Sequence, residues 1–394
     1  MNHKIQQNVI QMQRIFLLPA FLVMFVLCSH AQTNAPVKLP DSISSGKQGE
    51  FHVQGMAVDK VNGFIYLSFT DKLVKMDMSG HLVGSVTGLV GHLGDLTFDP
   101  ETNQVYGSLE FKNDAIGKGI SKELGLKNSN DINFYIAIFD GARIGRPNMD
   151  AEKGDLVRTV YLKEVVDDYK AKVRLGDRMV KHRFGCSGID GVTIGPAIGH
   201  PNGHRKYLYV AYGIYGDTTR DDNNYQIILK YNLVDWDRLG QTLSQEKPHH
   251  SGPKAPPAKY FVKTGNTNYG IQNLAYDPYT GDFFAAVYRG AKRQFPNYGL
   301  FVIDGHKKPG NAEITSDNKT IKVKTLSLLH AGLNDAKSGV RGWNFKWGST
   351  GLFPLGQGLF YISHNRKTTD GQQATTIYKY KWIGSDEKAF ILVK

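Results

Sequence analysis

The chain has 394 residues, which is enough for one large domain or two smaller ones. It is basic, with a formal net charge of +12, but its Lys and Arg residues form no dense run with interleaved aromatic residues. A nucleic-acid partner is therefore not expected. A basic protein suits an anionic polymer, a phosphate ester or an envelope surface, although dispersed lysines also serve solubility.

The first 31 residues are typical of a secretory signal peptide. Arg14 precedes an apolar run at 15–27, and a Ser-His-Ala stretch offers cleavage after Ala31. That run is too short for a transmembrane span, and no other run is long enough. A lipoprotein anchored at Cys28 is the less favoured alternative, because Leu27 stands where a small residue is needed. We expect an exported protein, periplasmic or extracellular, with no transmembrane span after cleavage.

Cleavage after residue 31 would leave Cys186 as the one cysteine, so no intramolecular disulfide can form. Its glycine-rich surroundings, "FGCSGIDG", favour a small buried thiol over a nucleophile. The same cleavage removes two basic residues and no acid, so the mature chain stays basic.

One strand–turn–strand pattern recurs along the chain. In "HLGDLTFDPETNQVYGSL" (92–109) two strand-like runs flank an Asp-Pro turn, and "HVQGMAVDKVNGFIYLSF" (52–69) repeats this arrangement. In the alignment of these two copies, His52 falls on His92. Three further copies lie at 188–212, which has a longer turn, at 270–287, which has the same Asp-Pro turn, and at 348–364, which has a shorter one.

Each copy is followed by two further strand-like runs, such as "KLVKMD" and "HLVGSVT" after the first and "YGLFVID" and "IKVKTLSLL" after the fourth. Four antiparallel strands per repeat are typical of a β-propeller blade, whereas a β-sandwich would not explain the recurring turn. We expect an all-β, five-bladed β-propeller with four-stranded antiparallel blades, formed by residues 51–394 as a single domain. Residues 32–50 form an N-terminal segment, and six blades are the alternative if this segment begins another one. One helix is expected, at 164–175.

The stretches "GMAVDKVNGFIYLS" and "NLAYDPYTGDFFAAV" resemble blade strands of exported propellers such as the NHL and SMP-30-like groups. The resemblance covers blade strands and implies the fold. It implies no particular activity, because one fold hosts many functions.

In a propeller the first strand of each blade lines the central channel. The loops that lead into it share one face, here called the upper face, with the loops between the second and third strands. Where the first strands begin, every copy pairs glycine with polar residues that would project into the channel mouth. These residues either hydrogen-bond to one another and close the ring, or form a site. They are His52, Gln54, His92, Asp95, Asp190, Gln272 and Asn273.

The loops between the second and third strands add His, Tyr and Arg to the upper face, and long loops on a rigid scaffold often carry chemistry. The candidates in or beside them are Glu110, Tyr212, Arg220, Tyr288, Arg289, Arg293, His364 and Arg366. Asp99 and Asp277 belong to Asp-Pro turns on the opposite face, where aspartate caps the turn.

His, Tyr and Arg together fit β-elimination on a uronic-acid glycan, which needs a base for the proton next to the carboxylate and a cation for the developing enolate. The composition resembles that of propeller polysaccharide lyases. We therefore expect a secreted carbohydrate-active enzyme acting on an anionic glycan, or on another small anionic ligand. The catalytic candidates are His52, His92, Tyr212, Tyr288, Arg289 and His364. The carboxylate clamps are Arg220, Arg289, Arg293 and Arg366, unless these arginines are solvated loop charges.

Three alternatives remain open. A glycoside hydrolase would use two carboxylates from among Asp95, Asp190 and Glu110. Asp95, Asp190 and His92 could instead hold a divalent cation, Ca²⁺ in the first place. We expect a monomer in every case, and a non-catalytic propeller would bind a glycan or a protein on the same ring. In that case Trp343, and Trp347 if it does not simply pack its loop, would stack on sugar.

Overall fold

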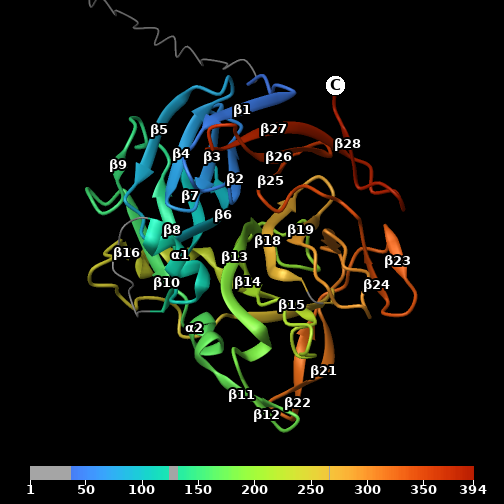
Figure 1. The fold of residues 1–394 in the computed structure, drawn as a ribbon. Coiled ribbons are helices and arrows are strands. Elements are labelled where there is room, and N and C mark those ends of the chain that lie inside the picture. Colours follow the sequence, from blue (N-terminus) through green and yellow to red (C-terminus); the bar gives the residue numbers. More distant parts are fainter. Residues whose placement is uncertain (1–36, 124–131, 266) are drawn as a thin grey trace, which may run out of the picture. The chain divides into compact units, whose positions relative to one another are not determined.

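A computed structural model describes residues 37–123, 132–265 and 267–394. The predicted signal peptide and its cleavage site therefore lie outside the described residues. Residues Val37–Lys394 form one compact unit. It is an all-β structure with five sheets arranged in a ring, a five-bladed β-propeller (Figure 1). None of its described helices is both long and apolar enough to cross a membrane.

The blades are numbered from the N-terminus, and their strands are given from the channel outward. Blade 1 consists of β2 (Gly55–Asp59), β3 (Phe64–Phe69), β4 (Lys72–Asp77), β5 (Leu82–Thr87) and β9 (Met149–Asp150). Blade 2 consists of β6 (His92–Asp99), β7 (Gln104–Phe111), β8 (Asn133–Asp140), β10 (Val157–Tyr161) and β16 (Gln241–Thr242). Blade 3 consists of β13 (Cys186–Gly195), β14 (Tyr207–Ile214), β15 (Tyr225–Asn232), β17 (Ala258–Lys263), β22 (Lys319–Thr325) and β21 (Gly310–Ser316).

Blade 4 consists of β18 (Asn268–Asp277), β19 (Asp282–Tyr288) and β20 (Leu300–Ile303). Blade 5 consists of β25 (Leu352–Gly356), β26 (Leu359–Lys367), β27 (Gln373–Trp382) and β1 (Ser42–Lys47), with β28 (Phe390–Leu392) also beside β27. Two separate hairpins pair β11 (Lys172–Leu175) with β12 (Arg178–Lys181) and β23 (Leu333–Asp335) with β24 (Val340–Gly342). The helices are α1 (Ala115–Glu123), α2 (Lys163–Lys170), α3 (Trp236–Leu239), and the 3₁₀ turns η1 (Arg183–Gly185) and η2 (Leu233–Asp235).

The five blades agree with the predicted number, but four strands per blade are not confirmed, because the blade sheets hold from three to six strands. The run "IKVKTLSLL", expected as the outer strand of blade 4, begins in β22. That strand pairs in parallel with β17 of blade 3. The helix expected at 164–175 covers Lys163–Lys170, and the chain then turns into β11.

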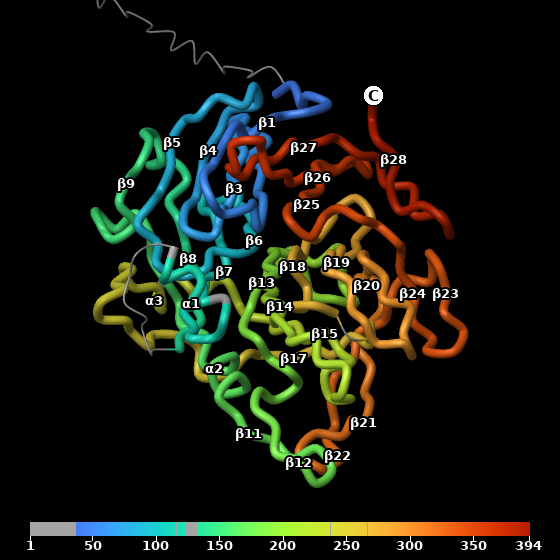
Figure 2. Tube along the Cα trace, viewed as in Figure 1, coloured from blue at the N-terminus to red at the C-terminus, as the bar shows by residue number. Residues whose placement is uncertain are grey.

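The ring is closed by a strand from the N-terminal segment. β1 pairs antiparallel with β27 of the last blade, and Ile43 of β1 is buried in the apolar cluster shared by blades 5 and 1. Figures 1 and 2 show this first strand, in blue, beside the red strands of blade 5. The segment that we set apart from the propeller therefore supplies one of its strands, and this pairing covers an edge that would otherwise be exposed.

The first strands of the five blades align with one another in sequence, so equivalent residues form successive layers around the channel. The uppermost layer, here called the polar ring, contains Gln54, Gly94, Asp190, Gln272 and Thr350. The next layer contains three glycines together with Asp95 and Asn273, here called the plug. The third layer is apolar and contains Met56, Leu96, Val192, Leu274 and Leu352. Polar groups are thus concentrated at the upper end of the channel.

Candidate functional site

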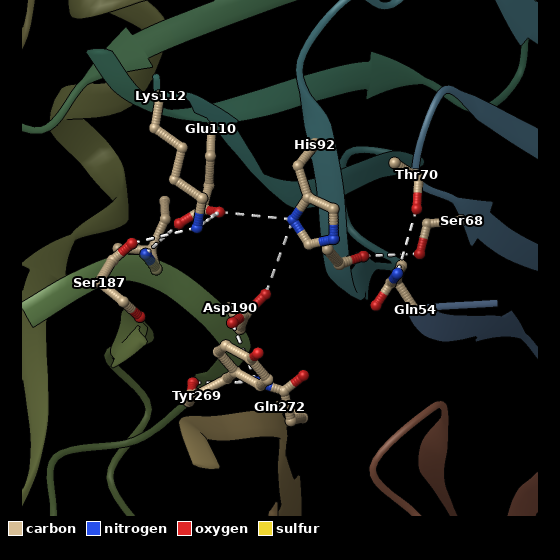
Figure 3. A network of polar contacts seen from close by, with 12 residues as sticks. Gln54, Ser68, Thr70, His92, Glu110, Lys112, Ser187, Asp190, Tyr269 and Gln272 are labelled. Carbon is tan, nitrogen blue, oxygen red and sulfur yellow. Dashed lines mark hydrogen bonds and ion pairs between the residues drawn. The ribbon is translucent and has the colours of Figure 1, made fainter. Parts of the chain in front are cut away.

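The polar ring meets the end of β7 in a cluster of one histidine and two carboxylates. His92 begins β6, Glu110 lies near the end of β7, and Asp190 lies in β13 of the next blade. The Nδ1 atom of His92 lies 3.4 Å from Oε2 of Glu110 and 3.9 Å from Oδ1 of Asp190 (Figure 3). The sequence predicted all three residues on the upper face, and the fold brings them into contact.

Glu110 lies at the base of this cluster, with a side chain that is 1% exposed. Its Oε1 accepts a hydrogen bond of 2.6 Å from the backbone N–H of Ile189, and its Oε2 lies 2.7 Å from Nζ of Lys112. Burial alone would raise the pKa of Glu110, but Lys112 and His92 outweigh it and hold that pKa below its usual value. Gly188 makes room for this carboxylate, since a Cβ there would lie 1.9 Å from Oε1.

Asp190 lies closer to the channel mouth, with a side chain that is 10% exposed. Its Oδ2 accepts a hydrogen bond of 3.0 Å from the side-chain amide of Gln272, which also donates to the carbonyl of Tyr269. Burial, with the neighbouring charge of Glu110, raises the pKa of Asp190 well above its usual value. The two carboxyl groups therefore have pKa values shifted in opposite directions.

His92 lies between these two carboxyl groups. Both contacts converge on Nδ1, although neither has hydrogen-bond geometry, and the ring's other nitrogen, Nε2, points away from both (Figure 3). A carboxylate beside one ring nitrogen keeps the proton there and leaves the other nitrogen free to accept one. The second histidine, His52, is half-buried nearby, and burial together with His92 lowers its pKa to about 4.

Further polar side chains surround the cluster. Gln54 donates its side-chain amide to Oγ1 of Thr70 at 3.1 Å. Tyr288, at the end of β19, is half-buried, and burial with the nearby charge of Asp190 raises its pKa to about 12. Its phenol therefore stays protonated at neutral pH. Gln54, Tyr288 and Gln272 thus lie at or beside the upper ends of the first and second strands.

Two predicted ligand-binding residues of the first strands are structural. Oδ2 of Asp95 accepts hydrogen bonds of 2.9 Å from the backbone N–H groups of both Val192 and Leu274, and Oδ1 accepts one from Leu96. The side chain of Asn273 donates to the carbonyls of Gln54, Gln272 and Ser349 and accepts from the N–H of Leu352. Both are buried, and their bonds join all five blades. Here the ring-closing alternative is correct.

Two loop candidates are structural as well. Tyr212 is fully buried in the core of blade 3, where its hydroxyl donates to Oδ2 of Asp168 at 2.9 Å. Arg220 is buried, forms a two-bonded ion pair with Asp222, and donates to the carbonyls of Lys181 and His182. Neither side chain is available to a ligand, because every polar group that it offers already has a partner.

The other arginines do not join the cluster. Arg289, Arg293 and Arg366 are exposed. Arg289 donates to the carbonyl of Asn297, and Arg366 donates to the hydroxyl of Thr376. The cation near His92 is therefore not one of the predicted arginines but a lysine, Lys112, which the sequence analysis missed. Its position two residues after Glu110, in "EFKND", is the signal that could have identified it.

The aromatic candidates of blade 5 pack against one another. Trp343 is buried and donates its indole N–H to the carbonyl of Ser385. His364 stacks on Trp347 with ring centroids 3.8 Å apart, and the hydroxyl of Tyr380 lies 2.9 Å from its Nε2. Burial lowers the pKa of His364 to about 4. Trp343 therefore offers no platform for a sugar, and His364 belongs to the packing of its blade rather than to the site.

Among the described residues, His92, Glu110 and Asp190 form the group whose ligand atoms lie close enough, within 4.8 Å of one another, to share a metal ion. Calcium prefers six to eight oxygen ligands. The cluster offers two carboxylates and an imidazole, and the ammonium of Lys112 already contacts Glu110. Asp95, predicted as a calcium ligand, has both oxygens occupied by backbone N–H groups. These residues do not fit a resident calcium ion.

The fold and the cluster together define a five-bladed β-propeller with a buried histidine–carboxylate site at the upper channel mouth. No protein-family model matches the chain, and no curated protein matches it.

Proposed function

We propose that the protein is a carbohydrate-active enzyme that cleaves an anionic, uronic-acid-containing glycan by β-elimination, with His92 as the base. The observation that carries this proposal is the pair of contacts at Nδ1 of His92 with Glu110 and Asp190. They place carboxyl groups beside Nδ1, while Nε2 has no hydrogen-bond partner among the described residues, and this suits a base with a carboxylate beside it.

The neighbouring groups supply the rest of the reaction. Nε2 of His92 removes the proton from the carbon next to the uronate carboxylate, a C=C bond forms, and the C–O bond to the leaving sugar breaks. The phenol of Tyr288, which is protonated at neutral pH, gives its proton to the leaving oxygen. Protonated Asp190 donates a hydrogen bond to the uronate carboxylate as it becomes an enolate, as neutral buried carboxylic acids do at other sites.

Hydrolysis by a carboxylate pair is the second candidate. It is favoured by one observation, the opposite pKa shifts of Glu110 and Asp190 in neighbouring positions. Against it, the Glu110 side chain is 1% exposed and contacts Lys112, so it is poorly placed to meet a sugar ring. The buried Glu110 suits the orientation of His92 better than direct attack.

Incubation with a panel of uronic-acid and neutral polysaccharides tests the proposal. We expect new ultraviolet absorbance from an unsaturated uronate, and the Arg366→Ala variant, changed at an exposed residue outside the cluster, should produce it at the wild-type rate. New reducing ends without that absorbance would instead support hydrolysis. Binding with no product on any glycan would support a non-catalytic glycan-binding propeller and contradict the enzymatic proposal.

The variant Asp190→Asn separates the two reactions. In elimination Asp190 acts as a neutral donor, and asparagine is a neutral donor of similar shape, so turnover should stay within about tenfold of wild type. The wild-type rate should fall at alkaline pH, where Asp190 loses its proton despite its raised pKa, and this decline should vanish in the variant. In hydrolysis Asp190 is the acid, so the variant should lose turnover by about 10²-fold or more. The pH profile of kcat/KM measures both outcomes.

A further inference from the structure

A cavity occupies the lower half of the channel, on the far side of the plug from His92. Its volume is ≈ 560 Å³, within the range of small-molecule sites. Residues of all five blades line it, from the apolar third layer downward, and none of its lining residues belongs to the polar ring or the plug. It is therefore a separate space from the candidate active site, and we call it the lower vestibule.

The walls of the lower vestibule are mainly apolar. Val58, Leu96, Ile194, Leu274 and Leu352 contribute aliphatic side chains from five different blades. Proline and aromatic residues add to them near the opening, including Pro278, Tyr276 and Phe353. A concave, mainly apolar surface of this size, built on rigid strands with polar groups toward its opening, is what binding sites for small apolar molecules have in common.

The opening of the vestibule carries one lysine that forms no ion pair among the described residues, Lys60, although its charge opposes the rise that burial causes in the pKa of Asp277. Lys206 is paired with Asp99 and Glu101, at 3.5 Å and 2.8 Å. Lys60 is exposed, and its ammonium donates to the carbonyl of Leu355 at 2.9 Å without an ion pair among the described residues. An anionic group at the opening would contact Lys60 while an apolar body fills the space above it.

We propose that the lower vestibule binds a small, largely apolar molecule that carries one anionic group, with Lys60 as the residue that recognises the anion. This site does not depend on the proposed function, because the hydrogen-bonded plug of Asp95 and Asn273 separates it from His92. The protein would thus have two sites on one axis, a polar site at the upper mouth and an apolar site at the lower one.

Two fluorescent probes with related ring systems test this site, the anionic 8-anilinonaphthalene-1-sulfonate and the neutral N-phenyl-1-naphthylamine. Both should bind the mature protein saturably at one site, with the anionic probe the tighter. Ile194→Trp, which fills the space, should weaken both probes by about tenfold or more, whereas Ile194→Val should bind both like wild type. Lys60→Gln should weaken the anionic probe by about fivefold and leave the neutral probe unchanged.

The variants also define the results that would overturn the proposal. Absence of saturable binding, or equal binding to Ile194→Trp and wild type, would exclude the vestibule as the site. Loss of probe binding in His92→Ala would place the probe at the upper mouth and have the same consequence. If Lys60→Gln left both probes unchanged, recognition of an anion by Lys60 would be wrong. Thermal unfolding of each variant shows that it is folded, and Ile194→Phe replaces Ile194→Trp if the latter is not.

Discussion

Replacing Asp95 with alanine is expected to lower the free energy of unfolding by at least about 3 kcal/mol, or to prevent folding. The carboxylate accepts hydrogen bonds from three backbone N–H groups, those of Leu96, Val192 and Leu274, and each belongs to a different blade. Alanine leaves all three donors buried without a partner, and an unsatisfied buried donor costs about 1–3 kcal/mol. Equilibrium urea denaturation measures the loss.

Asp190→Ala is the matched control for this prediction. Asp190 lies in the polar ring, one layer above the plug, and it is also a buried aspartate on a first strand. Burial raises the pKa of both aspartates well above the usual value, but Asp190 accepts from a side-chain amide and from no described backbone N–H. We expect the control to unfold at nearly the wild-type urea concentration. A similar loss in both variants, or none in Asp95→Ala, would contradict the structural role given to the plug.

The comparison of Asp95 with Asp190 also shows where sequence reasoning reaches its limit. The repeat placed both residues near the start of a first strand, because aligned copies of one strand have equivalent positions in the ring. Asp95 is equivalent to Gly191 and Asp190 to Gly94, so the two aspartates lie one position apart along the repeated strand, and their roles differ. That shift turns Asp190 toward the mouth and Asp95 toward the N–H groups of neighbouring blades. Which backbone donors lack partners depends on packing between blades, and the residue types alone do not record it.

The same limit explains why the predicted outer strand of blade 4 and the predicted role of Arg220 were wrong. The repeat predicted five blades, but it could not predict that β22 crosses from blade 4 to pair with β17 of blade 3, because parallel pairing between distant segments leaves no local pattern. Arg220 looked like a free clamp, yet Asp222, two residues away, neutralises it inside the protein. Long side chains reach local partners that a prediction from loop position cannot identify.

Replacing His92 with alanine is expected to reduce kcat on the glycan by about 10²–10⁴-fold, the usual contribution of a general base. Glu110→Gln should have a smaller effect, because the base itself remains and the amide keeps the shape of Glu110. The loss that remains comes from the missing negative charge beside Nδ1. Substrate affinity should change little in either variant, since Gln272, Asp190 and Tyr288 remain. The signature of a base is thus a loss in kcat with nearly constant KM.

Two further measurements make this prediction specific to His92. The second histidine of the mouth, His52, is the control, since burial keeps its pKa near 4 and it contacts neither carboxylate by an ion pair. His52→Gln should therefore keep most of the activity. Added imidazole should restore part of the turnover of His92→Ala, because the lost side chain leaves space for a base of the same chemistry beside Glu110. Full activity in His92→Ala, or a loss confined to KM, would make the cluster a binding site and support the non-catalytic alternative.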